Sequence, residues 1–347
     1  MNGGLKMASI SGAVVTGGAG FIGSHLCEAL LNRGMPVISV DNYSTGLREN
    51  TSHLEQLSKP QNFLTVEADA AQPWSWQKKI PNGWLKKISH VFHFASPASP
   101  PLYQEMAFST LWVNALGLKN AIEFADSLAP AADEHGARVI FASTSEIYGD
   151  PSVSPQPETY WGNVNSFGIR SCYDESKRFG EALIFTHNWK KNTQHGLVRI
   201  FNTYGPRMNP HDGRVVINFL VQACENQPLT IYGDGQQTRS FCYIDDLVDG
   251  ILRYAESSLT EPLNLGNDTE FTVLQLAEAV ESLVHEKNLP LVFRSLPKDD
   301  PKQRRPDLSR AREKLAPWEP RISLSDGLQR TYEWLKSQRR NNLRHLI

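Results

Sequence analysis

The chain has 347 residues, of which 40% are hydrophobic and 21% charged, and its formal net charge at pH 7 is −2. This composition is typical of a globular protein with one large or two modest domains, and it argues against a nucleic-acid-binding or polybasic membrane surface. No stretch approaches the roughly 20 apolar residues that span a bilayer, and four scattered cysteines without a C-x-x-C pair indicate reduced thiols of a cytoplasmic protein, not a metal site.

The first residues, M-N-G-G-L-K-M-A, lack the apolar core of a signal peptide and predict a short disordered lead. A strand is predicted at 13–15, and it opens into T-G-G-A-G-F-I-G and an apolar helix pattern that runs from Ile22 to Leu30. Gly17, Gly20 and Gly23 form G-x-x-G-x-x-G, whose first two glycines let the backbone approach a pyrophosphate and whose third allows close helix–strand packing. The order strand, glycine turn, helix therefore predicts a dinucleotide site.

A second strand is predicted at 37–40 and ends at Asp41. An acid near this distance from the glycine turn binds the adenosine ribose hydroxyls. Its charge would repel a 2′-phosphate, so the sequence favours NAD over NADP. The alternative is an aspartate that only caps the next turn.

Further strands are predicted at 63–66, 91–94 and 139–142, with helical segments between them, notably at 107–126. Alternating strands and helices predict an α/β fold of the Rossmann type, with a doubly wound parallel sheet. Ligands bind beyond the carboxyl ends of such strands. The residues expected there are Asp69, Ala95, Ser96, Ser143, Thr144 and Glu146. The segment 72–89, with three tryptophans and four lysines, is predicted to be an amphipathic surface insertion.

The stretch from Ser143 to Lys177 contains a hydroxyl, a carboxylate, a phenol and an amine. Tyr173 and Lys177 are four residues apart and would share one helix face. An ammonium beside the phenol would lower the pKa of Tyr173 toward neutral and make it a base. Y-x-x-x-K alone also occurs by chance in ordinary helices.

After Arg199 the pattern is less regular and richer in glycine, proline and polar loops. We expect one domain at 9–200, rejoined by 236–260, and a smaller α/β substrate domain at 201–347. Helices are predicted at 245–254, 272–287 and 327–335, and 229–232 is a short apolar segment. Arginines in these loops suit bidentate phosphate contacts, although a solvated role is equally compatible with each of them.

These features resemble the extended short-chain dehydrogenase/reductase family, which shares the glycine motif, Y-x-x-x-K and a C-terminal nucleotide-sugar domain. Within it, the chain is most similar to the UDP-glucuronate decarboxylases. The likeness is carried by H-F-A-S-P-A-S-P-P-L-Y (93–103), S-T-S-E-I-Y-G-D-P (143–151), Y-W-G-N-V-N (160–165), C-Y-D-E-S-K-R (172–178), R-I-F-N-T-Y-G-P-R-M (199–208), Y-G-D-G-Q-Q-T-R-S-F (232–241) and D-D-P-K-Q-R-R-P-D (299–307). It spans nearly the whole chain, although 70–89 and 127–135 are longer than is usual in that family.

The resemblance implies NAD-dependent conversion of UDP-glucuronate to UDP-xylose: C4 is oxidised, the resulting β-keto acid loses carbon dioxide, and C4 is reduced again. It implies that Tyr173 is the base, that Lys177 lowers its pKa, and that Thr144 orients the C4 oxygen. Related 4,6-dehydratases carry an Asp-Glu pair whose aspartate helps to expel the 6-hydroxyl group, and this chain has Ser145 there. Simple 4-epimerases usually lack the glutamate, so the pair Ser145-Glu146 favours decarboxylation. Arg304 would steer the carboxylate or stabilise the enolate; otherwise it is a solvated member of a basic run.

The resemblance also implies two sets of binding residues. The cofactor would contact Gly17, Gly20, Phe21, Ile22, Gly23, Asp41, Asn42, Asp69, Ala95, Ser96, Asn114, Ser143, Tyr173 and Lys177. The nucleotide sugar would contact Tyr103, Glu146, Asn202, Arg207, Arg214, Val216, Thr230, Tyr232 and Arg239. A homodimer is expected through the helices that carry Leu111 and Tyr173.

Three alternatives stay open at this point. The chain could be a nucleotide-sugar 4-epimerase or 4,6-dehydratase of the same family. It could be a decarboxylase that releases a 4-keto pentose. A non-catalytic NAD-sensing protein is a third alternative, although the four residues Thr144, Glu146, Tyr173 and Lys177 are all present.

Overall fold

The computed structural model describes residues 9–57, 62–81, 83–129, 136–284, 289–296 and 303–344. The expected lead at 1–8, most of the expected insertion at 127–135 and the expected end of a helix at Lys287 lie outside these residues.

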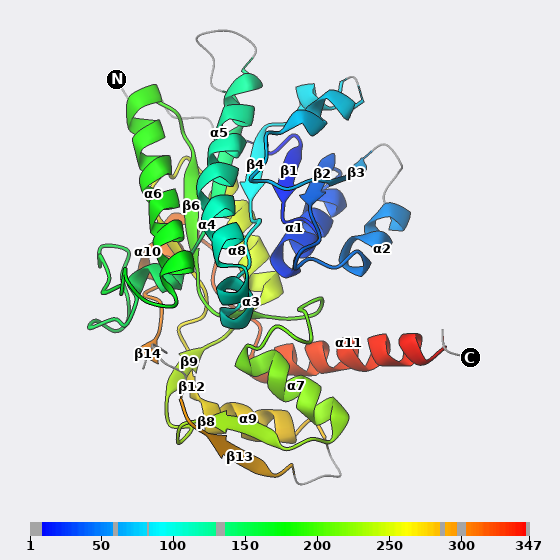
Figure 1. Cartoon of the computed structure of the whole chain (residues 1–347), viewed down its shortest axis with the longest axis vertical. Coiled ribbons are helices and arrows are strands. Elements are labelled where there is room, and N and C mark those ends of the chain that lie inside the picture. The colour runs from blue at the N-terminus through cyan, green and yellow to red at the C-terminus, as the bar shows by residue number, and fades with distance from the viewer. Residues whose placement is uncertain are drawn as a thin grey trace.

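A seven-stranded sheet lies in the larger part of the molecule (Figure 1). Every neighbouring pair in it is parallel. Its order is β11 (Leu263–Leu265), β6 (Gly196–Ile200), β5 (Arg138–Thr144), β4 (His90–His93), β1 (Ala13–Thr16), β2 (Val37–Asp41) and β3 (Phe63–Glu67). The order reverses between β1 and β4, which confirms the predicted doubly wound fold and places the ligand crevice at the carboxyl ends of those two strands.

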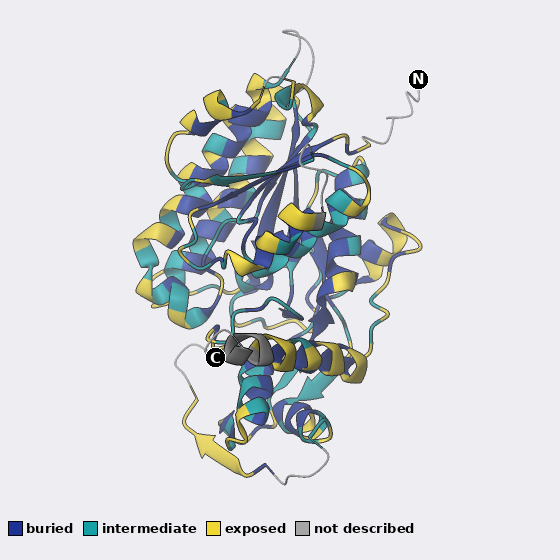
Figure 2. Cartoon of the chain, turned by 90° about the vertical axis from the view of Figure 1, so that its right-hand side faces the viewer, coloured by how far each residue is buried: buried dark blue, intermediate teal, exposed yellow. Residues whose placement is uncertain are grey.

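The strands are buried on both faces, because successive side chains point to opposite sides of the sheet. Ala13 and Val15 belong to one hydrophobic core, while Val14 between them belongs to a second. Likewise, Phe92 belongs to the first core and Val91 to the second. Figure 2 shows the buried strands as a continuous blue layer between helices.

Helices cover each face. The first core includes residues of α1 (Phe21–Asn32) and α8 (Ile244–Glu256), which pack together, and α2 (Glu49–Leu57) lies beside them. The second core includes residues of α5 (Leu118–Ser127) and α6 (Ser171–Lys191), with α4 (Ala107–Trp112) packed on α6. The helix predicted at 107–126 is therefore two helices, joined by a π-helical turn at Val113–Gly117.

The segment predicted as a surface insertion contributes to the core instead. It forms two short 3₁₀ helices, η1 (Ser75–Lys79) and η2 (Leu85–Lys87). Trp74 and Trp76 are each 6% exposed, and their rings lie 5.2 and 5.5 Å from that of Phe124 in α5. The amphipathic pattern was correct, but its apolar side covers one edge of the second core.

The smaller part of the molecule lies beyond the carboxyl ends of the sheet (Figure 1). It contains α7 (Val215–Glu225), α9 (Val273–Glu281), α11 (Leu324–Arg344) and three small sheets: β8 (Leu229–Tyr232) with β13 (Leu291–Arg294), β9 (Thr238–Ser240) with β12 (Glu270–Thr272) and β14 (Gln303–Arg304), and β7 (Thr203–Tyr204) with β10 (Cys242–Tyr243). The short helix α10 (Ser309–Lys314) packs against β11 of the large sheet instead. Between β10 and β12 the chain returns through α8 and β11 to the large sheet, so the rejoining segment extends beyond residue 260. The domain boundaries themselves stay a prediction.

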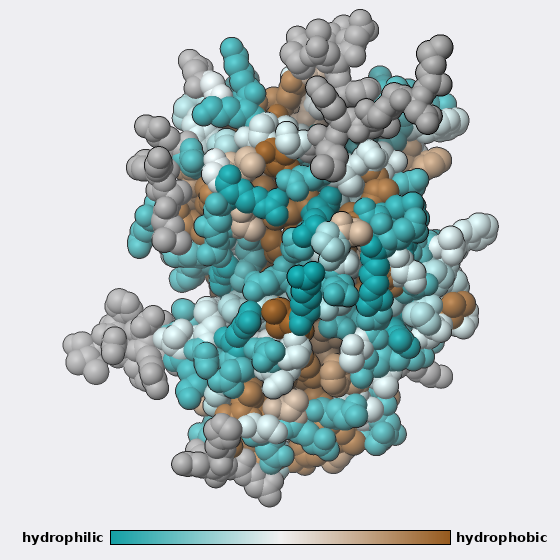
Figure 3. Space-filling view, turned by 180° about the vertical axis from the view of Figure 1, so that it is seen from behind, coloured by the Kyte–Doolittle hydropathy of each residue, from teal (hydrophilic) through white to brown (hydrophobic). Residues whose placement is uncertain are grey.

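Seen from behind, hydrophobic residues show in small areas between hydrophilic ones (Figure 3). Among the described residues, no helix combines the length and the apolar character required to cross a bilayer.

Candidate active site

The glycine turn after β1 has no room for side chains. Gly17 has a φ of +71°, and a Cβ on it would lie 2.8 Å from the backbone of Ala95 at the end of β4. A Cβ on Gly23 would lie 2.0 Å from the carbonyl oxygen of Gly17. The turn and the end of β4 therefore meet at the switch point, and the turn leads directly into Phe21, the first residue of α1. Backbone in this arrangement suits a pyrophosphate.

Asp41 lies at the end of β2 and faces the glycine turn. Its Oδ2 accepts a hydrogen bond of 2.9 Å from the N–H of Ala19, and its Oδ1 accepts one of 2.8 Å from the N–H of Tyr43. Burial raises its pKa, and these N–H groups act against that effect. The aspartate thus does cap the following turn, while lone pairs of both oxygens are left for hydroxyl donors.

The other expected cofactor residues lie at neighbouring strand ends or against them. Asn114 donates to Ser96 Oγ at 3.1 Å, while its own Oδ1 is buried and lacks a partner among the described residues. Asn42 and Asp69 each cap the residue two positions later, with hydrogen bonds of 3.1 and 2.9 Å. The tight glycine turn, the available oxygens of Asp41 and the unpaired amide oxygen of Asn114 fit a dinucleotide.

Tyr173 and Lys177 are both buried on α6, as their spacing predicts, but their electrostatics differ from the prediction. Burial raises the pKa of Tyr173 to about 12, against weaker lowering by a hydrogen bond with Thr144 and the charge of Arg214. Burial also lowers the pKa of Lys177 to about 7. Lys177 Nζ donates to the carbonyl oxygen of Ala142 at 2.7 Å and lies 5.7 Å from the centre of the Tyr173 ring. The expectation that Lys177 brings the Tyr173 pKa toward neutral is wrong for this structure, because desolvation dominates.

Thr144 and Glu146 follow β5. The Oγ1 of Thr144 accepts the N–H of Glu146 at 3.2 Å and caps the 3₁₀ turn η4 (Ser145–Tyr148). The two oxygens of Glu146 are shared between two guanidinium groups: Arg304 donates to Oε1 and Arg170 to Oε2. Burial raises the pKa of Glu146, but the charges and hydrogen bonds of the two arginines outweigh it and lower the pKa to about 2.

Arg304 is 3% exposed and is not a solvated member of a basic run. It lies on β14 opposite Arg239 of β9, and its Nη2 donates to the carbonyl oxygen of Gly149 at 3.1 Å. Its contact with Glu146 spans 158 positions of sequence.

The sequence analysis did not identify Arg170, Asp174 or Glu181. Arg170 directly precedes α6, and nothing in its local sequence distinguishes it from a surface arginine. Glu181 accepts a hydrogen bond of 2.5 Å from Ser143 Oγ and forms a bidentate pair with Arg199. The Ser143 hydroxyl therefore donates to Glu181, and the expectation that Ser143 contacts the cofactor stays a prediction.

Tyr103 and Arg214 both lie near Tyr173. Tyr103, on α3 (Pro100–Glu105), stacks on the Tyr173 ring at 4.9 Å. Burial raises its pKa, and its hydroxyl is buried without a partner among the described residues. Arg214 is the N-cap of α7 and forms a bidentate pair with Asp212 at 2.5 and 2.9 Å.

Most of the remaining expected substrate residues belong to the smaller part of the molecule. Val216 is 4% exposed within α7, and Thr230 on β8 exchanges two hydrogen bonds with Gln222. Tyr232, at the end of β8, is 40% exposed. The backbone of Asn202 accepts the N–H of Cys242 at 2.9 Å.

Arg207 is placed elsewhere. It has a φ of +66°, and its Nη2 donates to Glu28 and, at 2.8 Å, to His25, both on α1. These residues line a cavity of about 1180 Å³ between α1, α2, α8 and α11, which contains none of the catalytic residues. The expectation that Arg207 contacts the substrate is therefore not supported by its position, because its guanidinium is directed to Glu28 and His25 on α1, at a cavity that none of the catalytic residues line.

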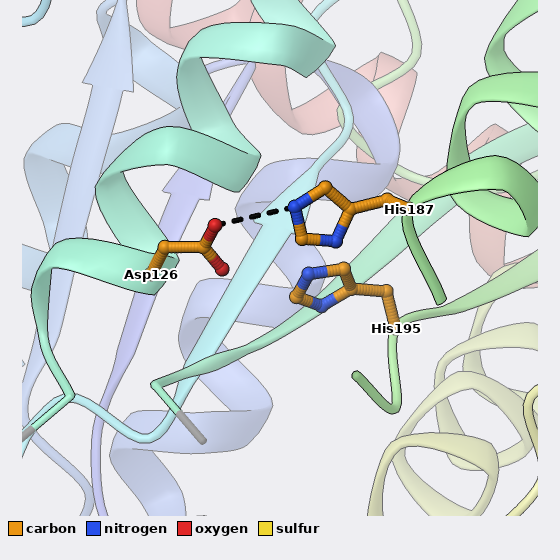
Figure 4. Close-up of side chains that lie close together, drawn as sticks. All are labelled: Asp126, His187 and His195. Atoms are coloured by element: carbon orange, nitrogen blue, oxygen red, sulfur yellow. Dashed lines mark hydrogen bonds and ion pairs between the residues drawn. The ribbon is translucent and has the colours of Figure 1, made fainter. Parts of the chain in front are cut away.

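Asp126, His187 and His195 gather at the opposite end of α6 (Figure 4). His187 Nε2 lies 3.2 Å from Asp126, and the N–H of Val139 donates to His195 Nδ1 at 3.1 Å. A neutral His195 accepting at Nδ1 carries its proton on Nε2, so this nitrogen is not available as a metal ligand. We interpret the cluster as a structural hydrogen-bond network.

Comparisons with known proteins agree with this geometry. The model of the NAD dependent epimerase/dehydratase family matches residues 13–266. UDP-glucuronic acid decarboxylase 2 of Arabidopsis thaliana is 46% identical over 325 residues, which are 94% of this chain and 68% of that protein. UDP-glucuronic acid decarboxylase 1 of Danio rerio is 40% identical over 325 residues, again 94% of this chain and 72% of that protein.

Two solved structures have the same fold at lower identity. UDP-glucuronic acid 4-epimerase from Bacillus cereus, in complex with UDP-glucuronic acid and NAD, has a TM-score of 0.79 and 29% identity and covers 94% of this chain and 99% of its own. UDP-glucose 4-epimerase from Thermotoga maritima, with UDP-glucose, has a TM-score of 0.80 and 28% identity, with the same coverage.

Proposed function

The chain belongs to the NAD dependent epimerase/dehydratase family, and on this premise we propose that it decarboxylates UDP-glucuronate to UDP-xylose with NAD as cofactor. The relatives that share 40–46% of its residues carry the name UDP-glucuronic acid decarboxylase. The 4-epimerases share only 28% and 29%.

One observation supports decarboxylation most strongly: Glu146 lies between Arg170 and Arg304, two residues after Thr144. The two arginines hold Glu146 in its ionised form, so it carries no proton to donate to a leaving 6-hydroxyl group. Two buried guanidinium groups suit a substrate that itself carries a carboxylate. Ser145, where dehydratases of the family have an aspartate, points the same way.

The cofactor would be held by the glycine turn, Asp41 and the strand ends near Asn114. A bound NAD would supply the hydride acceptor and donor for C4, and its positively charged nicotinamide would lower the pKa of a neighbouring phenol. Net redox change is zero, so the cofactor has no need to leave.

The residues of the chain would do the following. Tyr173 takes the proton of the C4 hydroxyl and later returns it, while Thr144 hydrogen-bonds the same oxygen. The C4 ketone makes the C6 carboxylate that of a β-keto acid, whose electrons flow into an enolate as carbon dioxide leaves. Arg304 would hold the carboxylate, stabilise the enolate charge and position the water that protonates C5, because its guanidinium is itself too basic to act as the acid. Arg214 and Arg239 would bind the diphosphate, with Tyr232 beside the base.

The identity of the product distinguishes the candidate activities. The NAD-loaded chain is incubated with UDP-glucuronate, and the products are followed by ¹H NMR. UDP-xylose is the expected product. UDP-galacturonate would instead assign a 4-epimerase, and a 4-keto pentose would show that the final reduction fails.

We also propose a homodimer through α4 and α6. Phe108 and Trp112 are 76% and 52% exposed on α4, and Phe179 is 52% exposed on α6. The α4 pair is four residues apart and thus on one helix face, and the two helices pack side by side, with Phe179 on the side of α6 that carries Cys172 and Ser176, which contact Tyr103 and Asn114. An exposed aromatic stripe across neighbouring helices suits a second copy, because a two-fold axis brings the same stripe opposite itself.

A further inference from the structure

Asp174 lies behind the guanidinium of Arg170, one residue after Tyr173, and is 5% exposed. Its Oδ2 is 4.0 Å from Nε of Arg170, and its Oδ1 has no hydrogen-bond partner in the described part of the chain. Arg170 directs its Nη2 to Glu146 instead. Asp174 is therefore a buried carboxyl group whose ionised form is poorly compensated.

Charged and titratable groups face Asp174 from every element around it. They are Glu146 of η4, Arg304 of β14, Tyr103 of α3, and Arg170, Cys172, Tyr173 and Glu175 from the start of α6 and the residue before it. Burial and the charge of Glu146 raise the pKa of Asp174 to about 7, although Arg170 and Arg304 oppose the shift. The N-terminal turn of α6 also favours the ionised form, so the carboxyl group is poised between its two states.

The next step rests on the proposed function. In a hexuronate, C6 is two bonds from C4, so a sugar whose C4 oxygen contacts Thr144 and Tyr173 brings its carboxylate next to Glu146. The two arginines balance Glu146 and an ionised Asp174. A third carboxylate would leave this buried group of charges with a net charge of −1, which is costly at low dielectric.

We propose that Asp174 is a positioning residue that takes up one proton from solvent when the acid sugar binds, so that Arg170 and Arg304 can hold the carboxylates of Glu146 and of the substrate together. Binding of an acid sugar is thereby coupled to protonation of Asp174. A neutral sugar, which adds no charge, would bind without this proton.

Calorimetric titration in buffers of different ionisation enthalpy measures the proton uptake. The NAD-loaded Tyr173→Phe variant is used, because decarboxylation itself consumes a proton and must be blocked. At pH 7.5 UDP-glucuronate is expected to bind with uptake of about half a proton or more, and with almost none at pH 5.5, where Asp174 is already protonated. UDP-xylose, which lacks only the carboxylate, is expected to bind with none.

Adding Asp174→Asn to this variant is expected to abolish the uptake, whereas adding Glu175→Gln, a matched change at the next and more exposed carboxylate, should preserve it. Equal uptake for both ligands, or persistent uptake in the Asp174→Asn variant, would overturn the inference. If the Asp174→Asn variant does not fold, the difference in proton uptake between UDP-glucuronate and UDP-xylose tests the inference by itself. Failure of UDP-glucuronate to bind would overturn the proposed function, while binding without uptake overturns only the role of Asp174.

Discussion

The rings of Tyr103 and Tyr173 lie flat against each other, with centroids 4.9 Å apart and planes inclined by 8°. Tyr103 is 1% exposed and Tyr173 is 6% exposed, so each ring limits the movement of the other. Helix α3, which carries Tyr103, therefore fixes the phenol to which we assign the proton transfer.

This contact predicts different results for two changes at Tyr103. Tyr103→Phe keeps the stacked ring and removes a hydroxyl without a partner, so its free energy of unfolding in urea should stay within about 1 kcal/mol of the wild type. Tyr103→Ala leaves a cavity and should lose about 3–5 kcal/mol. If the hydroxyl binds the sugar, Tyr103→Phe raises KM while kcat changes little. A large loss of stability in Tyr103→Phe would show that its hydroxyl has a partner.

Lys177 makes the stability of the fold depend on pH. Its pKa falls from 10.5 to about 7 on burial, so between these values the unfolded chain binds more protons than the folded chain. The contribution of Lys177 to the free energy of unfolding therefore rises as pH increases from 7 to 10.5. Lys177→Met has no charge to bury and should melt above the wild type at pH 7, with a difference that shrinks toward pH 10. The exposed Lys119→Met serves as control, and a difference between Lys177→Met and the wild type that is constant with pH would contradict this account.

Asp41 predicts the choice of dinucleotide. Asp41→Asn retains an oxygen for the turn N–H groups but removes the charge that opposes a 2′-phosphate. The ratio of the Kd for NADP to that for NAD, measured by quenching of intrinsic fluorescence, should fall by about tenfold or more, the equivalent of about 1.4 kcal/mol. An unchanged ratio would show that Asp41 acts only as the turn cap seen in its two backbone hydrogen bonds.

The proposed dimer predicts that charge on the aromatic stripe keeps the chain monomeric. Trp112→Glu combined with Phe179→Glu should halve the mass measured by analytical ultracentrifugation, because a carboxylate cannot be buried in an apolar interface without a partner. Phe293→Glu, at a distant exposed phenylalanine on β13, is the matched control. A wild-type chain that sediments as a monomer would contradict the proposed homodimer.

Local patterns were enough to predict five of the seven strands of the large sheet and one wall of the site, while β6 and β11 were not predicted. The glycine spacing, the strand-end acid and the i, i+4 pair on α6 each depend on neighbours within a few residues, and all lie where the sequence predicts. The surface insertion was misjudged, because an amphipathic segment does not reveal that Phe124, about 50 positions away, covers its tryptophans.

Contacts between distant segments could not be predicted in this way. Arg170 and Arg304 meet at Glu146 across 24 and 158 positions, and neither arginine has a local pattern that separates it from a solvated one. Arg207 shows the opposite error: its loop suggested a phosphate ligand, but the fold brings it to Glu28. The prediction for the Tyr173 pKa was wrong for a related reason, because the burial that raises this pKa depends on the whole fold.

The most direct test of the central claim uses UDP-glucuronate labelled with ¹⁴C at C6. The account predicts that the NAD-loaded chain releases one labelled carbon dioxide for each UDP-xylose formed, without net accumulation of NADH. It also predicts that Tyr173→Phe, while still binding NAD, loses on the order of 10²-fold or more of this rate. Consumption of the substrate with all label retained in the nucleotide sugar would contradict decarboxylation, and full turnover by Tyr173→Phe would contradict the assigned base.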